Sequence, residues 1–548
     1  MNHRTLLINL ILAINFSIYP QSPTKLPAST NILIILTDNQ AYNELSFKGH
    51  PIVQTPHIDK LSKEGIDFTN FHAPAYCSPS RAALLTGRHP LRYGIHNTIG
   101  GVSILHKREK TLANFFKDAG YKTAIFGKWH LGMSYPYAPR FRGFEESFIH
   151  GGGGIGQLED AHGNTHIDAH YWHNGKLVPS KGYSSDILFD KAIDFIEKNK
   201  DKPFFCFVST PATHAPYQEH PEAAKRIRAR GITTGNIALY SMIENIDDCV
   251  GKILKKLDDL KLKDNTIVII ATDQGSLKRF RDTQPKDLHS RVFYMMRYPK
   301  AIKPSTVNND LTGMTDVLPT LLDLCDIEVP NNLDGRSLRP LLSGSKNWQD
   351  ERIIILQCPR NRKRTKWKNA KLITPNYYLD ASKRLYDRSK QLADVTQQIP
   401  EIHQQILKTY EDFWKSLESE NQLICRHEIG LNPTRLCAMD WYKGSSPWNR
   451  NSQKHKKGRG TWAIEVTQDG RYRFELSHYS LEAKKAIEAT SVEINIGDSK
   501  ASTKLLSNDY SAIVELDLKA GTYDMNTLFH DQSGTKWGCL FAYITLIK

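Results

Sequence analysis

One cysteine, Cys77, stands at the start of a segment whose residue types favour binding of an oxyanion. The segment from Ala75 to Arg88 is A-Y-C-S-P-S-R-A-A-L-L-T-G-R. Pro79 suits the first position of a helix, and Ala82 to Leu85 would form its first full turn. Cys77 would then face unpaired backbone N–H groups and the positive end of the helix dipole, with Arg81 one turn along. We therefore expect an anion to bind beside Cys77.

Two pairs of oxygen-bearing side chains follow two separate apolar runs. Asp38 and Asn39 come directly after the run 31–37, and the run 266–271 leads to Asp273 and Gln274. Two carboxylates and two amides, with no histidine or thiolate, favour a hard divalent cation over zinc. The sequence therefore predicts a calcium site formed by these four residues, with magnesium as the alternative.

Three further basic side chains occupy similar places. Lys128 and His130 follow the apolar run 121–126, and His214 follows the run 204–209. In an open α/β sheet, ligands bind at the carboxyl ends of the strands. We expect all of these polar residues to meet along one edge of a sheet.

The elements that must position them alternate between buried strands and helices. Continuous apolar runs of strand length are typical of parallel strands covered on both faces. Helical patterns lie between and after them, at residues 111–119, 185–198, 236–260 and 315–323. This alternation predicts an α/β domain over residues 29–345, with a mostly parallel sheet flanked by helices.

The remainder of the chain changes character twice. Residues 346–420 contain short strand candidates at 353–357, 371–374 and 377–379, then a helix at 401–417, which predicts a small antiparallel α+β subdomain. Residues 421–548 hold alternating, aromatic-rich runs separated by turns, as in a β-sandwich. Four tryptophans there either pack in its core or bind carbohydrate: Trp441, Trp448, Trp462 and Trp537.

The motifs around these residues resemble those of a known family. C-x-P-S-R at Cys77 lies within an ordered series over residues 32–275, namely I-L-T-D-N-Q, T-P-H-I-D-K-L, F-T-N-F-H-A-P, G-K-W-H-L-G and A-T-D-Q-G. The series resembles the formylglycine-dependent sulfatases of the alkaline-phosphatase-like superfamily. The resemblance implies an exported bacterial enzyme, a sulfuric ester hydrolase that removes sulfate from a carbohydrate.

The resemblance also implies a role for each residue of the site. Cys77 would be oxidised to formylglycine (3-oxoalanine) by a formylglycine-generating maturation enzyme, and its hydrate would attack sulfur beside the metal. Arg81 would hold this diol and the metal ligands, while Lys128 would pair with sulfate oxygens. His130 would act as the base that ejects sulfate, and His214 would protonate the leaving oxygen or bind sulfate.

The sequence departs from the family pattern at three places. Asn39 replaces a second aspartate, and Gln274 replaces an asparagine. Both substitutes still offer a carbonyl oxygen, but the site loses one negative charge, so weaker calcium binding or a different division between calcium and magnesium is expected. The final substrate-binding lysine aligns poorly; we favour Lys278 among Lys278, Arg279, Arg281 and Lys286.

The N-terminus predicts export. One basic residue and an apolar run from Leu6 to Ile18 are typical of a signal peptide over residues 1–22, and no later segment is apolar enough to span a membrane. We therefore expect a secreted or periplasmic protein. In that context, two of the eight cysteines, Cys425 and Cys437, could pair across a loop.

The charge favours an anionic partner. The chain of 548 residues carries a formal net charge of +15, and its densest basic run, Arg360 to Lys368, is either a solvated loop or a polyanion contact. With an export signal and no recognition motif for nucleic acid, a sulfated poly- or oligosaccharide is the expected partner. In the cluster His162, His166, His170 and His173, we expect His170 or His166 to contact the sugar together with the tract Gly151 to Gly154, and a second metal is the alternative.

Two other functions stay open at this point. A phosphonate or phosphate ester hydrolase of the same superfamily would use a similar pocket and cysteine. A non-catalytic protein that binds sulfated glycans would explain Asn39, Gln274 and the unclear lysine as signs of decay. The intact Cys77, Arg81 and Lys128 favour the enzyme.

Overall fold

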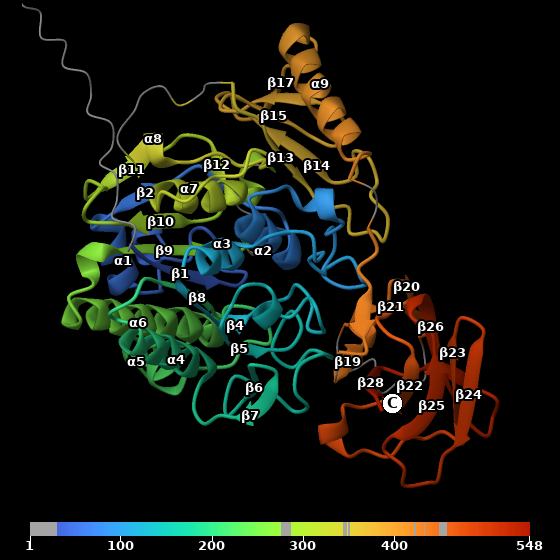
Figure 1. Ribbon diagram of the computed structural model, residues 1–548. Coiled ribbons are helices and arrows are strands. Elements are labelled where there is room, and N and C mark those ends of the chain that lie inside the picture. The colour runs from blue at the N-terminus through green and yellow to red at the C-terminus, as the bar shows by residue number, and fades with distance from the viewer. Residues whose placement is uncertain are drawn as a thin grey trace, which may run out of the picture.

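The computed structural model describes residues 30–275, 286–342, 348, 351–420, 423–431, 433–448 and 458–547. Its largest element is a ten-stranded sheet (Figure 1). In spatial order the strands are β11 (Thr306–Asn308), β2 (Ile66–Phe68), β10 (Tyr294–Arg297), β9 (Thr266–Thr272), β1 (Asn31–Thr37), β8 (Phe204–Ser209), β4 (Lys122–Lys128), β5 (Glu146–His150), β6 (His170–His173) and β7 (Lys176–Pro179).

The centre of this sheet is parallel, as the sequence predicts. β9, β1, β8, β4 and β5 run in the same direction, whereas β10 and the hairpin β6–β7 pair antiparallel with their neighbours. All seven residues of β1 are buried. Its side chains alternate between two cores, since Ile32, Ile34 and Leu36 pack on one face while Leu33 and Ile35 pack on the other.

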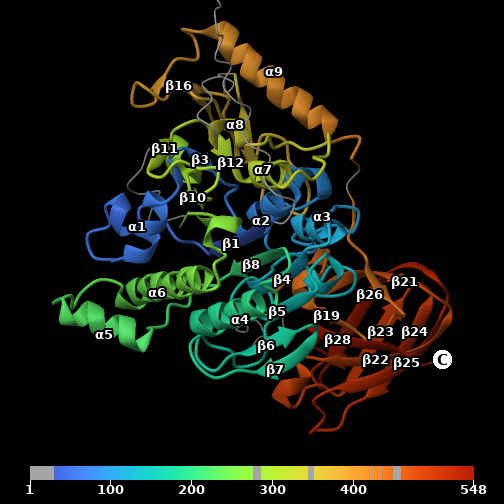
Figure 2. The ribbon, with the colours of Figure 1, turned by 60° about the vertical axis from the view of Figure 1, so that its left-hand side comes forward.

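Helices cover both faces of the sheet (Figures 1 and 2). One core contains residues from α2 (Cys77–Thr86), α3 (Leu112–Asp118), α7 (Val317–Leu324) and α8 (Arg339–Leu342). The other contains residues from α1 (Pro56–Lys63), α4 (Ser184–Lys198) and α6 (Ile237–Asp259), and α5 (Pro221–Ala229) packs on α6. A separate short pair joins β3 (Phe71–His72) to β12 (Thr312–Gly313). The α/β architecture is therefore confirmed.

The helix after Cys77 begins earlier than predicted. Cys77 is the first residue of α2 and Tyr76 is its N-cap, so Pro79 is the third helical residue, not the first. Proline is tolerated there because the first N–H groups of a helix have no partner within it. The shift puts the Cys77 side chain directly at the positive end of the helix.

Beyond the sheet lies a smaller antiparallel one, covered by a helix. It comprises β13 (Ile354–Gln357), β14 (Ala370–Ile373), β15 (Tyr377–Leu379), β16 (Leu385–Asp387) and β17 (Ala393–Asp394). Ile406 and Tyr410 of α9 (Pro400–Ser416) pack into its core. The predicted α+β arrangement is confirmed.

The C-terminal region is a sandwich of two antiparallel-rich sheets (Figure 1). One contains β18 (His427–Ile429), β21 (Gly460–Val466), β26 (Gly521–His530), β23 (Ser491–Ile496) and β24 (Ser499–Lys504), with β20 (Lys443–Gly444) and β27 (Lys536–Gly538) attached. The other contains β19 (Thr434–Cys437), β28 (Phe541–Leu546), β22 (Gly470–Ser477) and β25 (Ala512–Leu518). Side chains from both sheets share one core, as in a β-sandwich.

Two sequence-based alternatives are settled by this packing. Trp441, Trp462 and Trp537 are buried, so they stabilise the core and do not bind carbohydrate, whereas Trp448 is 54% exposed. The suggested disulfide is wrong: Cys425 and Cys437 are free thiols, and the Cys425 thiol donates to the carbonyl of Ile104.

Among the described residues, none of the helices is long and apolar enough to cross a membrane. The predicted signal peptide, residues 1–22, lies outside the described residues.

Candidate active site

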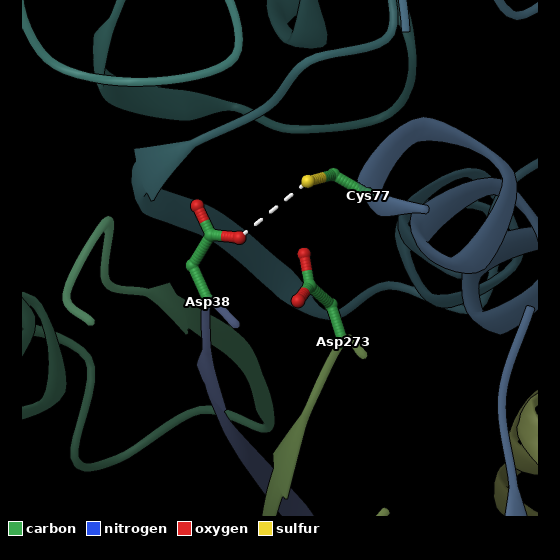
Figure 3. Close-up of side chains that lie close together, drawn as sticks. All are labelled: Asp38, Cys77 and Asp273. Atoms are coloured by element: carbon green, nitrogen blue, oxygen red, sulfur yellow. Dashed lines mark hydrogen bonds between the residues drawn. The ribbon is translucent and has the colours of Figure 1, made fainter. Parts of the chain in front are cut away.

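Two acidic side chains meet at the carboxyl ends of β1 and β9. The strands are parallel neighbours, with Thr37 opposite Thr272, so the residues that follow, Asp38 and Asp273, emerge side by side (Figure 3). Backbone hydrogen bonds hold this edge, because Asp273 N–H donates to the carbonyl of Thr37 at 3.0 Å. Both aspartates are fully buried. The predicted meeting of polar residues at one sheet edge is confirmed for this pair.

Cys77 lies opposite the two carboxylates, at the start of α2. Its Sγ is 3.6 Å from Asp38 Oδ1 (Figure 3). One ligand atom each from Cys77, Asp38 and Asp273 lie within 4.8 Å of one another, the one such group of potential metal ligands in the described part of the chain. Helix α2 is buried along its whole length, so this thiol is held rigidly against the acidic pair.

The two amides close the same site. Gln274 Nε2 donates to Cys77 Sγ at 3.1 Å and also to Asn39 Oδ1. Asn39 N–H donates to Asp273 Oδ1 at 3.1 Å. Gln274 Oε1 is buried without a hydrogen-bond partner among the described residues. An orphaned amide oxygen beside two carboxylates fits a hard cation, so the residues present suit the predicted metal.

Two buried cations balance the aspartates. Lys128 Nζ lies 2.5 Å from Asp38 Oδ2, and both side chains are completely buried. Arg81 binds Asp273 Oδ2 through Nε at 3.0 Å and through a terminal nitrogen at 2.9 Å. Its other nitrogen donates to the carbonyl of Lys128 and to Ser209 Oγ. Arg81 thereby links the ends of β9, β4 and β8.

These contacts and the burial of the site shift the pKa values of Asp38, Asp273 and Cys77 in different directions. For Asp38, burial opposes ionisation, but the charges of Lys128, His214 and Arg81 outweigh it and hold the pKa below its ordinary value. Burial and the neighbouring Asp38 raise the pKa of Asp273 to about 6. Burial raises the pKa of the Cys77 thiol to about 12, the nearby aspartates adding to the effect. A thiol kept neutral is a weak nucleophile.

The two predicted histidines lie against the glycine tract. Gly153 is so close to His130 that a Cβ on it would lie 2.2 Å from the imidazole Cε1. A Cβ on Gly154 would lie 2.9 Å from His214 Nδ1. His130 Nε2 donates to the carbonyl of Thr98 at 3.0 Å. The tract therefore packs closely against the two imidazoles, and its contact with a sugar stays a prediction.

The C-terminal sandwich holds the loops around this site. Gly100 N–H donates to the carbonyl of Met439 at 2.7 Å, close to Thr98. Leu158 N–H donates to the carbonyl of Trp448, and the Arg435 guanidinium donates to the carbonyl of Glu159. The loops that carry Thr98 and Gly153 are thus attached to the sandwich.

One buried residue of the site, His150, is not predicted from the sequence. His150 ends β5 opposite Lys128 and is fully buried. Its Nδ1 donates to the carbonyl of Gly151 at 2.9 Å, while its Nε2 has no partner among the described residues. Burial, assisted by Lys128, lowers its pKa to about 3, so the ring is neutral. Its place at a strand end, the signal that identified Lys128, could have found it.

Other predicted residues lie elsewhere. Lys278 is outside the described residues. The predicted histidine cluster contributes no second metal group among the described side chains. His166 is buried and its Nδ1 lies 2.7 Å from Ser184 Oγ, so it packs in the core and does not contact a sugar.

Comparison with known proteins shows to which family the chain belongs. The model of the Sulfatase family matches residues 30–327, and that of the N-sulphoglucosamine sulphohydrolase C-terminal family matches residues 285–406. The chain belongs to the sulfatase family. As a sulfatase it is a sulfuric ester hydrolase, and the matched region contains both aspartates, Cys77 and the basic side chains around them.

Individual sulfatases resemble the chain at moderate identity. An ulvan-active sulfatase of Formosa agariphila is 30% identical over 368 residues, covering 60% of this chain and 68% of the relative. The N-acetylgalactosamine-6-sulfatase of Canis lupus familiaris is 30% identical, covering 58% and 67%. An N-acetylglucosamine-6-O-sulfatase of Bacteroides thetaiotaomicron is 27% identical, covering 57% and 70%.

Solved structures share the sulfatase fold. Ps i-CgsB, crystallised with k-i-k-neocarrahexaose, superimposes with a TM-score of 0.63 at 24% identity, covering 73% of this chain and 95% of its own. The PsFucS1 sulfatase of Pseudoalteromonas sp. gives 0.60 at 19% identity, covering 72% and 92%. The phosphonate monoester hydrolase of Agrobacterium radiobacter gives 0.50 at 21%, covering 71% and 96%. The alkaline-phosphatase-like fold is thus common to sulfate and phosphonate ester hydrolases.

Proposed function

We propose that this sulfatase removes sulfate from a sulfated carbohydrate, with formylglycine derived from Cys77 as its nucleophile. The observation that carries the proposal is the position of Cys77: its Sγ lies at the N-terminus of α2, 3.6 Å from Asp38. Because burial keeps the thiol neutral, the unmodified cysteine is badly suited to attack sulfur. Oxidation to the aldehyde and hydration would supply hydroxyl groups at the same position.

A divalent cation would be held by Asp38, Asn39, Asp273 and Gln274, with calcium preferred. Such a cation supplies positive charge that lowers the pKa of a neighbouring hydroxyl group. Arg81 and Lys128 neutralise the two carboxylates, so adding the cation would give the pocket a net positive charge. A positive, buried pocket suits a sulfate ester.

The protein's own residues would divide the proton transfers. One hydroxyl of the hydrate releases its proton to solvent and attacks sulfur, and the bond from sulfur to the ester oxygen breaks. His214 gives the leaving oxygen a proton, so that the alcohol departs. His130 then takes the proton of the second hydroxyl; the carbon–oxygen bond to sulfate breaks, and the aldehyde forms again. Lys128 keeps the sulfate oxygens in place through both steps.

The proposed substrate is a sulfated poly- or oligosaccharide outside the cytoplasm. The relatives named above act on ulvan and on sulfated amino sugars, and the net charge of +15 favours a polyanion. The apolar run at the N-terminus supports secretion or delivery to the periplasm.

The test begins with the modification. The chain is coexpressed with a formylglycine-generating enzyme, and the peptide that contains Cys77 is examined by mass spectrometry for conversion of the thiol to an aldehyde. Sulfate release is then measured on ulvan oligosaccharides and on 6-sulfated N-acetylhexosamines. We expect conversion and release, both absent in Cys77→Ala.

Other outcomes would identify the alternative functions. Faster turnover of a nitrophenyl phosphate or phosphonate than of the sulfate would favour the phosphonate or phosphate ester hydrolase. A thiol that stays unconverted beside the maturation enzyme, in a protein that still binds sulfated glycans, would favour the non-catalytic binder.

A further inference from the structure

The basic run Arg360 to Lys368 is mostly committed to the protein itself. Arg362 donates to the carbonyls of Gly100 and Trp441, and Arg364 donates to that of Leu417. Lys366 pairs with Glu411, and Lys368 donates to Asn361 Oδ1. Within the described chain, only the side chains of Arg360 and Lys363 in this run have neither an ion pair nor a hydrogen bond. The run is therefore not a uniform solvated loop.

Arg360 contacts the residue that precedes Cys77. Its guanidinium carbon stacks 4.6 Å from the centroid of the Tyr76 ring. Tyr76 is the N-cap of α2 and directly precedes Cys77. The Arg360 guanidinium therefore packs on the residue that leads into the helix bearing Cys77. The Arg360 side chain is exposed, so its charge faces solvent there.

The backbone holds Arg360 in this place. It adopts a left-handed conformation, with φ 55°, which residues other than glycine seldom take. Its N–H donates to the carbonyl of His96 at 3.0 Å. Thr98 lies two residues after His96, and its carbonyl accepts a hydrogen bond from His130 Nε2. Residues 96–98 thus connect Arg360 to a second part of the proposed machinery.

A guanidinium stacked on an aromatic ring keeps its N–H edge available. That planar edge matches the two oxygens of a carboxylate or a sulfate group. We propose that Arg360 determines specificity by binding a second anionic group of the glycan, a carboxylate or a sulfate, beside the sulfate ester that is removed. The inference rests on the proposed function and identifies its substrate as a glycan that carries closely spaced anions.

The experiment measures binding without turnover. The probe is a chondroitin 6-sulfate hexasaccharide, titrated calorimetrically into the full chain carrying Cys77→Ala. Arg360→Gln is expected to weaken binding about tenfold. Arg360→Lys, which keeps the charge and loses the planar guanidinium, is expected to bind the hexasaccharide with an affinity between those of Arg360→Gln and the chain with Arg360 intact. The matched control Lys363→Gln removes the same charge from the same run and is expected to change binding less than about twofold.

Modified probes distinguish the two anions. The loss caused by Arg360→Gln should shrink with a carboxyl-reduced hexasaccharide if Arg360 binds a carboxylate, and with a desulfated one if it binds a sulfate. No binding of the hexasaccharide, equal losses in Arg360→Gln and Lys363→Gln, or a loss unchanged by both modifications would overturn the inference. Sulfate release by the chain with Cys77 intact tests the proposed function separately, so the two failures are distinguishable.

Discussion

Replacing Gly153 with alanine tests whether the glycine tract positions the proposed catalytic base. The added Cβ would lie 2.2 Å from His130 Cε1. Nonbonded carbons approach to about 3.5 Å, so the imidazole must withdraw by roughly 1.3 Å. His130 is 8% exposed and its ring is hydrogen-bonded to Thr98, so such a movement breaks its alignment.

The expected loss follows from that displacement. Misplacing a catalytic group by about 1 Å costs roughly 100-fold in rate, or about 2.7 kcal/mol of transition-state stabilisation. We expect kcat for sulfate release by Gly153→Ala to fall by about that factor. Overpacking should lower the free energy of unfolding by about 1–3 kcal/mol. Calcium affinity should not change, since the four predicted ligands lie on other segments.

A matched control separates crowding from catalysis. Gly251 lies in α6, where an added Cβ would meet the His57 ring at 2.7 Å. His57 is exposed and outside the site, so Gly251→Ala should leave kcat unchanged. The assays are sulfate release on a glycan substrate and thermal unfolding. A folded Gly153→Ala protein that keeps kcat within about threefold of the parent would refute this reasoning.

Three further predictions concern the charges of the site. Lys128→Met leaves Asp38 buried without its partner and should lower the free energy of unfolding by about 3–5 kcal/mol in calcium-free protein, measured by urea denaturation; an unchanged value would contradict the ion pair. Asn39→Asp restores a negative charge and should tighten calcium binding about tenfold by calorimetry, whereas equal affinity would remove Asn39 from the ligand set. Burial, helped by the charges of Lys128 and Arg81, holds the pKa of His130 well below 6.5. A lowered pKa keeps the imidazole neutral as the pH falls from 7 to 6, so protonation of His130 should not lower kcat in that range. The pH profile of kcat checks this: a decline near pH 6.5 that is lost in His130→Gln would contradict the prediction.

The local sequence pattern is sufficient to predict the site residues that directly follow a buried strand. Asp38 and Asp273 could be paired in advance because parallel neighbours bring their carboxyl ends to the same edge. Cys77 could be assigned to a helix N-terminus from Pro79 and the alanines that follow, although the helix starts two residues earlier than expected. The sequence does not predict short strands such as β6 and β10, since runs of four residues carry little periodicity.

The roles of several other residues depend on contacts between distant segments. Cys425 and Cys437 looked suitable for pairing by spacing alone, yet the thiol of Cys425 packs against Ile104. Trp448 is exposed while three similar tryptophans are buried, and no local pattern distinguishes them. Long-range packing decides such cases.

The sequence by itself determined the α/β fold and the meeting of Asp38 and Asp273 at one edge of its sheet, because buried apolar runs that alternate with helices specify parallel strands whose carboxyl ends share an edge. Only the tertiary structure placed Gly153 behind His130, the sandwich behind the loop at Thr98, and Arg360 over Tyr76. Those contacts join segments far apart in the chain, and their geometry depends on how whole layers pack against one another. The sequence therefore predicts the reacting groups, and the packing defines the rim that we expect to select the substrate.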